Sequence, residues 1–158
     1  MQRISNPYDP EISKCFGCSD SNPIGLKLDF FEDGDIFGAT WVPTPDYSGF
    51  INLLHGGIAA TLIDEAGAWC VSVKCGTACV TSELKIRYLK PVYISRGTIR
   101  VTCRITEDTE RLTVVECKLH DGEGNVCVTG EGHFFKYPEE IARKKFYYPG
   151  KDAFYTDK

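Results

Sequence analysis

The sequence lacks an excess of positive charge, a long apolar run and a low-complexity segment. Its 158 residues carry 18 Lys and Arg against 22 Asp and Glu, so the formal net charge is −4. This sign opposes binding to a phosphate backbone, and we expect no nucleic-acid partner. The longest apolar stretch, 58–73, is interrupted by Asp64 and Glu65 and is too short to span a bilayer. We therefore expect no membrane partner either.

The first residues lack the apolar segment of an export signal. Residues 1–10 include Arg3 without an apolar stretch behind it, which predicts a cytoplasmic protein. In such a chain the eight cysteines are expected to be reduced rather than paired in disulfides. Several occupy apolar positions of alternating segments, as Cys103 does, where cysteine acts as a small hydrophobic residue.

One cysteine pair, Cys15 and Cys18, has the spacing of half a zinc site or of a redox pair. A structural zinc site needs two further ligands, and the sequence has no second Cys-x-x-Cys and no His-x-x-x-His. We therefore expect no metal and no cofactor. A metal-binding module is kept as an alternative, which stoichiometric zinc in the purified protein would favour.

The composition is that of a globular protein of one domain, with 42% hydrophobic and 25% charged residues. We divide it into an irregular leader over 1–23, a folded domain over 24–137 and an aromatic-rich tail over 138–158. The aromatic residues of the tail predict that it packs on the body or on a partner. They are Tyr147, Tyr148, Phe154 and Tyr155.

Alternating apolar residues and turn signals predict six strands around one helix. The expected strands are 26–31, 36–41, 80–88, 98–107, 112–121 and 125–136, with a loop over 42–54 and a helix over 56–73. Asp33-Gly34 turns the first hairpin. This order predicts an α+β domain in which a curved antiparallel sheet wraps around a central helix.

The predicted helix begins at Gly56 and Gly57, where we expect free backbone N–H groups at the positive end of the helix dipole. Asp64 falls on a helix face of small residues, such as Ala60 and Gly67, which allows another backbone or a ligand to approach closely. A carboxylate in such surroundings is the first indication of a site.

His55-Gly56-Gly57, with the acidic Asp64 nine positions after the histidine, resembles the hotdog-fold acyl-CoA thioesterases of the phenylacetate-pathway (PaaI-like) type. The resemblance covers about residues 24–137, and the preceding Cys-Phe-Gly-Cys and Asn-Pro-Ile-Gly-Leu segments are similar to the leader of a subgroup. It implies the hotdog fold, an acyl-CoA substrate and a homodimer whose subunits share each active site. A homotetramer is the alternative, although the charged outer sheet face disfavours a dry interface there.

The resemblance also implies roles for individual residues. Asp64 is expected to act as general base or nucleophile, and the Gly57 amide to polarise the thioester carbonyl. His55 either orders the glycines or binds substrate. Thr81 corresponds to a hydroxyl that positions the attacking water in some relatives, and is otherwise an ordinary strand threonine.

Five further residues are candidates for substrate binding: Asn52, Gly56, Glu65, Arg87 and Lys90. Some relatives carry an asparagine where Gly49 stands here, and Asn52 is the nearest substitute. Arg87 and Lys90 are cations suited to the phosphates of coenzyme A. Glu65 is a second carboxylate next to Asp64, or an ordinary helix charge.

These features together predict a thioester hydrolase that releases a free acid and coenzyme A from an acyl-CoA. The alternative is a hotdog protein that binds acyl-CoA without catalysis, because a fold does not determine a function. A hotdog dehydratase or hydratase is disfavoured, since such relatives place the catalytic histidine and acid in different surroundings.

Overall fold

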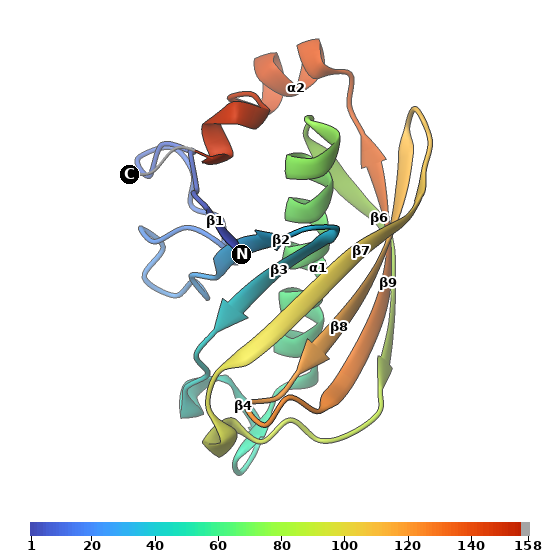
Figure 1. Ribbon diagram of the computed structural model, residues 1–158. Helices are drawn as coiled ribbons and strands as arrows, with labels where there is room; N and C mark the ends of the chain where they lie inside the picture. Colours follow the sequence, from blue (N-terminus) through green and yellow to red (C-terminus); the bar gives the residue numbers. More distant parts are fainter. Residues whose placement is uncertain (156–158) are drawn as a thin grey trace.

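A computed structural model describes residues 1–155 as a long sheet that curves around one central helix (Figure 1). The helices are α1 (Gly56–Cys75) and α2 (Glu139–Phe146), and the 3-10 turns are η1 (Pro45–Tyr47), η2 (Ile94–Arg96) and η3 (Lys151–Tyr155). The strands are β1 (Gln2–Ile4), β2 (Asp29–Asp33), β3 (Ile36–Trp41), β4 (Ser48–Phe50), β5 (Leu53–Leu54), β6 (Cys79–Tyr88), β7 (Ile99–Asp108), β8 (Leu112–His120) and β9 (Val126–Lys136).

Seven of the strands form one antiparallel sheet in the order β1-β2-β3-β7-β8-β9-β6, and β4 and β5 form a separate short hairpin. Helix α1 lies against the concave side of the large sheet (Figure 1). The predicted α+β class and central helix are confirmed. Strand β6 follows α1 directly but lies at the edge of the sheet, next to the last strand, β9.

The core lies between α1 and the sheet. Leu62, Ile63 and Ala66 are inaccessible to solvent on the helix face that meets the strands. Gly67 allows the closest approach, because a Cβ there would lie 2.7 Å from Cζ of Phe134 in β9. The helix ends at Gly76, whose left-handed backbone (φ 71°) is the usual conformation of a residue that follows a helix.

The two ends of the helix-and-sheet body differ from the sequence prediction. The strand predicted over 26–31 is β2, which begins at Asp29 rather than at residue 26. Lys27 has a left-handed backbone (φ 59°) that breaks the extended segment. The leader, expected to be irregular, supplies β1, in which Arg3 pairs with Phe31 of β2. The predicted loop 42–54 contains η1 and the β4–β5 hairpin.

The tail folds back on the body. Phe154 is completely buried and Tyr148 nearly so, and the Tyr148 hydroxyl donates a hydrogen bond to the carbonyl of Ser72 in α1 (2.9 Å). The backbone N–H of Ser5 donates to the carbonyl of Phe154 (2.8 Å), which joins the tail to the leader. The last three tail residues, 156–158, lie outside the described residues.

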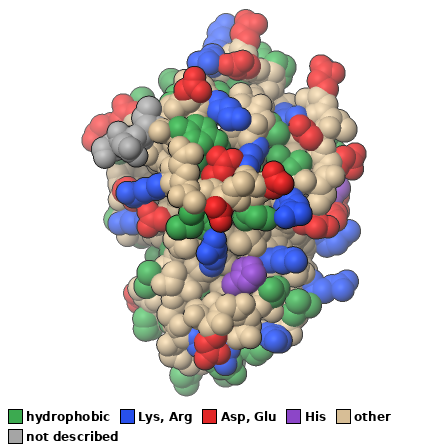
Figure 2. Space-filling view, viewed as in Figure 1, with side chains coloured by type: hydrophobic (Ala, Val, Ile, Leu, Met, Phe, Trp, Pro, Cys, Tyr) green, Lys and Arg blue, Asp and Glu red, His purple; other side chains and the backbone are tan. Residues whose placement is uncertain are grey.

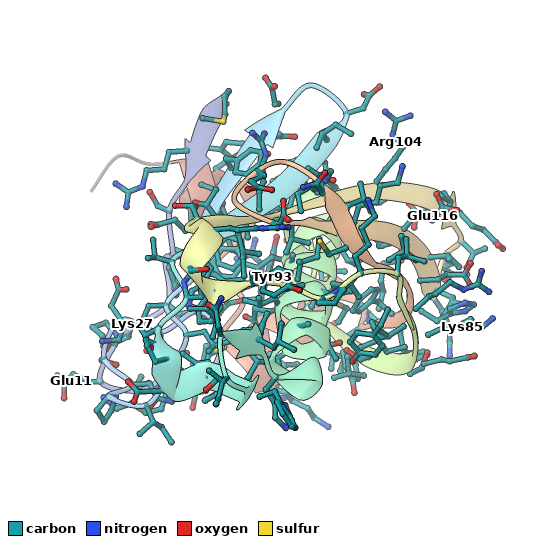
Figure 3. All side chains as sticks on the ribbon, turned by 90° about the horizontal axis from the view of Figure 1, so that it is seen from below. Glu11, Lys27, Lys85, Tyr93, Arg104 and Glu116 are labelled. Atoms are coloured by element: carbon teal, nitrogen blue, oxygen red, sulfur yellow. The ribbon has the colours of Figure 1, made fainter. Side chains whose placement is uncertain are left out.

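The outer face of the sheet is charged. Lys85, Arg104 and Glu116 extend from it away from α1 (Figure 3). On the face viewed in Figure 2, acidic and basic side chains are interspersed with apolar ones. All eight cysteines are free, as predicted. Within residues 1–155, the helices lack the combination of length and hydropathy needed to cross a bilayer.

Candidate active site

The start of α1 is capped by a histidine. His55 has an extended backbone, and its Nδ1 accepts a hydrogen bond from the N–H of Gly57 (2.9 Å). The expectation that both glycine amides are free is therefore wrong for Gly57, because a side-chain acceptor at the N-cap satisfies the second amide of the helix. The amides of Gly56 and Ile58 have no acceptor in the part of the chain that the structure describes.

Gly49 has a structural reason to lack a side chain, and Gly56 is in ordinary contact with Tyr88. The Gly56 carbonyl accepts a hydrogen bond from the hydroxyl of Tyr88 at the end of β6 (2.6 Å), and a Cβ on Gly56 would lie 3.4 Å from that hydroxyl oxygen. A Cβ on Gly49 would lie 3.1 Å from Cα of His55. Gly49 thus lets its strand pack closely against the helix start.

The asparagine considered as a substitute for position 49 is engaged elsewhere. Asn52 has a left-handed backbone, its Nδ2 donates to the Ser95 hydroxyl (2.9 Å), and its Oδ1 accepts from the Ser95 amide (2.9 Å). Asn52 therefore fixes the loop that leads to α1 against η2. Its side-chain amide is not directed at a substrate carbonyl in this arrangement.

The carboxylate of Asp64 meets the hydroxyl of Thr81. Asp64 lies in the middle of α1 and is half-buried, Thr81 lies near the start of β6 and is exposed, and Thr81 Oγ1 donates to Asp64 Oδ1 at 2.7 Å. The other carboxylate oxygen, Oδ2, has no hydrogen-bond partner among the described residues. A carboxylate held on one side and open on the other can accept a proton from water or attack a carbonyl carbon.

The two parts of the site are separated along the helix. Gly57 and Asp64 are seven residues apart, which is about two turns and about 10 Å of helix rise, so both lie on one face of α1. Gly57 and Asp64 of one chain are thus too far apart along the helix to contact the same carbonyl group directly.

Glu65 faces a different part of the molecule. Its Oε1 accepts hydrogen bonds from Trp69 Nε1 (3.0 Å) and from the thiol of Cys15 (3.2 Å). The thiol and amide of Cys18 hydrogen-bond to Cys15 and lower the pKa of its thiol, whereas the same contact and burial raise the pKa of the Cys18 thiol. The leader thus reaches the central helix, a contact that the sequence did not predict.

A cavity of about 750 Å³ lies beside this contact, between the leader, α1, the start of β6 and the tail. Aromatic side chains from three of these segments line it, among them Tyr8, Trp69, Tyr147 and Phe154. Glu65 lines this cavity, whereas Asp64 does not. The two adjacent acidic residues therefore serve separate regions.

The two candidate cations lie on different faces. Arg87 is two residues after Lys85 on β6 and therefore lies with it on the outer face of the sheet, away from α1. Lys90 follows β6 and lines a smaller cleft of about 260 Å³ that also includes Gly56 and Tyr88. Only Lys90 of this pair is near the helix start in the described structure.

Comparisons with known proteins identify the family. A model of the thioesterase superfamily matches residues 51–128, which include the helix start, Asp64 and Thr81. The BH2602 protein from Bacillus halodurans, solved with CoA, is 31% identical and superposes with a TM-score of 0.64 over 72% of this chain and 76% of that one. The chain belongs to the thioesterase superfamily.

Two further proteins are similar to part of this chain. The chain is 37% identical over 91 residues to "Putative esterase SSO1253" of Saccharolobus solfataricus, covering 55% of this chain and 57% of that relative. It thus spans little more than half the length of that protein. The PaaI protein of the phenylacetic acid degradation operon of E. coli has the same fold, with a TM-score of 0.65 at 21% identity over 72% of this chain and 82% of that one.

Proposed function

We propose that this protein hydrolyses acyl-CoA thioesters to a free acid and coenzyme A. The observation that carries the proposal is the carboxylate of Asp64, held by Thr81 through one oxygen and open at the other, on a helix that begins with two glycines. Asp64 removes a proton from the attacking water, or attacks the thioester carbon directly. When water attacks, collapse of the tetrahedral intermediate releases the free acid and the thiolate, which takes the proton that Asp64 removed from the water. When Asp64 attacks, collapse releases the thiolate and leaves an acyl anhydride on Asp64, which water then hydrolyses to the free acid, supplying the proton for the thiolate.

The start of α1 stabilises the negative charge that develops on the thioester oxygen. The amides of Gly56 and Ile58 have no acceptor among residues 1–155, and the helix dipole adds positive potential. The Gly57 amide joins them when His55, whose side chain is exposed, rotates away from it. His55 in this proposal orders the helix start before substrate binds.

The active site forms between two copies of the chain, with Asp64 from one and the helix start from the other. The helix rise between Gly57 and Asp64 supports this arrangement. The free edge of the sheet at β6 supports it as well, because Val80, Tyr88 and Leu89 are 40%, 54% and 51% exposed at or beside that strand. An unpaired edge strand with exposed apolar residues at its ends favours association with a second copy.

Two observations support coenzyme A as part of the substrate. The BH2602 protein was solved with CoA, and a cation, Lys90, lies near the helix start. Lys90 lines the same cleft as Gly56 and is the cation that we assign to coenzyme A binding. Arg87 would contact coenzyme A only if the ligand extends around the edge of β6 to the outer face.

The experiment is release of free thiol from short, medium, long and aromatic acyl-CoAs. We expect Asp64→Asn to lower kcat by about 100-fold or more while leaving the fold and dimer intact. Asp35→Asn, an exposed carboxylate in the β2–β3 turn, is the matched control and should retain parental turnover. Retained turnover in Asp64→Asn would refute the assignment of Asp64, and a monomer by light scattering would refute the shared site.

A second candidate is binding of acyl-CoA without hydrolysis. The observation that favours it is the hydrogen bond from the Gly57 amide to His55, which occupies the donor that the resemblance assigns to the carbonyl. The same panel distinguishes the two functions. Saturable binding of an acyl-CoA with no thiol released from any substrate would favour the binding protein.

A further inference from the structure

We propose that Cys15, Cys18 and Glu65 form a zinc site whose fourth coordination position opens into the cavity between the leader, α1 and the tail. One ligand atom from each residue, two sulfurs and one carboxylate oxygen, lies within 4.8 Å of the others. Cys18 is buried, and Cys15 and Glu65 are half-buried. All three residues line the cavity of about 750 Å³.

The distances suit a tetrahedral zinc ion. Zinc binds sulfur at about 2.3 Å and carboxylate oxygen at about 2.0–2.2 Å, which places a sulfur and an oxygen ligand about 3.5 Å apart. Cys15 Sγ and Glu65 Oε1 are 3.2 Å apart. Replacing the thiol proton between them by the ion therefore requires a shift of only a few tenths of an ångström.

The backbone of the Cys-Phe-Gly-Cys segment presents both sulfurs on one side. The N–H of Cys18 donates to Cys15 Sγ (3.3 Å), a contact that also stabilises a thiolate at Cys15. The segment is held to the body by hydrogen bonds from Leu26 N–H to the Phe16 carbonyl (2.7 Å) and from Leu28 N–H to the Gly17 carbonyl (3.0 Å). The two sulfurs are thus positioned before any ion binds.

The carboxylate of Glu65, the third ligand, is also held in position by its neighbours. A Cβ on Gly17 would lie 2.5 Å from Cδ of Glu65, so a larger residue at position 17 would require the Glu65 side chain to move away. Trp69 Nε1 donates to the carboxylate oxygen that faces Cys15 (3.0 Å). A donor of this kind, one shell outside the ion, orients a metal ligand and tunes its basicity.

The donor set selects zinc among the common divalent ions. Thiolates are soft ligands that favour zinc over magnesium or calcium, and a carboxylate completes three protein ligands. Three protein ligands with the fourth position open is the arrangement of zinc sites that bind water or another small ligand. A sequence search for paired ligands misses this site because Glu65 is 47 residues away from Cys18 in the chain.

The test uses Co²⁺ and Zn²⁺ added to the full chain after treatment with a reductant and a chelator. We expect one equivalent of Co²⁺ to produce thiolate-to-cobalt charge-transfer and tetrahedral visible bands, and one equivalent of Zn²⁺ to remove them. Zn²⁺ should also protect two thiols of the parent protein from a thiol reagent. Because neither readout involves hydrolysis, the result is independent of the proposed thioesterase activity.

Variants identify the ligands. Cys15→Ser and Cys18→Ser should each abolish the charge-transfer band, and Glu65→Gln should weaken Co²⁺ binding by at least about 10-fold. Cys79→Ser is the matched control, because Cys79 lines the same cavity but its thiol contacts the Ala68 carbonyl (3.5 Å), and it should bind Co²⁺ as the parent does. Absence of cobalt bands and of zinc protection in the parent, or unchanged bands in Cys15→Ser, would overturn the proposal.

Discussion

The turn between β8 and β9 contains a buried carboxylate whose titration should control acid stability. Asp121 Oδ1 accepts hydrogen bonds from the backbone amides of Glu123 (3.1 Å) and Asn125 (2.9 Å), and Oδ2 accepts from Arg96 Nη1 (2.7 Å). Burial alone would raise the pKa of this carboxyl. The donated hydrogen bonds and the guanidinium outweigh burial and lower the pKa of Asp121 from 3.8 to about 2.

The size and sign of the effect follow from this pKa. The folded state binds the proton more weakly than the unfolded state, so ionised Asp121 stabilises the fold at every pH above about 4. The stabilisation is lost as the pH falls from about 4 through 2. With about 1.4 kcal/mol for each pH unit between the two pKa values, it amounts to at most about 2.5 kcal/mol.

The assay is urea unfolding of the parent and of Asp121→Asn at several pH values between 7 and 2. Asp121→Asn should lower the free energy of unfolding by about 2 kcal/mol at pH 7, and the difference between the two proteins should shrink below pH 4. Asp35→Asn is the control and should follow the parent at each pH. A difference that stays constant from pH 7 to pH 2 would show that the Asp121 carboxylate is not held in this way.

Two further substitutions test the site and the tail. Thr81→Val removes the hydroxyl 2.7 Å from Asp64 Oδ1 and should lower kcat about 10-fold, because a hydrogen bond to a charged group is worth about 1.5–3 kcal/mol. Thr81→Ser should restore most of the rate, and equal rates for valine and serine would exclude a role for the hydroxyl. Tyr148→Phe leaves the Ser72 carbonyl without its donor and should lower the free energy of unfolding by about 1 kcal/mol in denaturant titrations. Tyr147→Phe, at a tyrosine 67% exposed, should have no effect, and equal losses in both variants would contradict this role of the buried hydroxyl.

The strands from β6 onward and α1 could be predicted because each has strong local signals. The apolar and polar alternation of β7 gives one buried face, and its register with β8 places Cys103 opposite Cys117 inside the sheet. The glycines at both ends mark the limits of α1. The start of β2 was misplaced because the left-handed backbone at Lys27, which no side-chain pattern announces, ends the preceding segment.

The candidate site was only partly predictable. The nine-residue spacing of His55 and Asp64 identifies the helix that carries the candidate site, and the resemblance makes Thr81, which donates to Asp64, a candidate as well. The hydrogen bond from the Gly57 amide to His55 Nδ1 could not be predicted, because it depends on the rotamer of the His55 side chain. The hydrogen bond between the Asn52 and Ser95 side chains could not be predicted either, because these residues are 43 positions apart in the sequence.

The sequence by itself determined the order of the elements, the one long helix and the acidic residue on its small-residue face, because these depend on periodicity and spacing within short segments. The tertiary structure alone decided which distant groups meet. It placed Glu65 beside Cys15 rather than beside Asp64, and put β1 and the tail against the body. The physical reason is that adjacent helix residues point about 100° apart, so the packing of the chain ends around α1 assigns each carboxylate its surroundings.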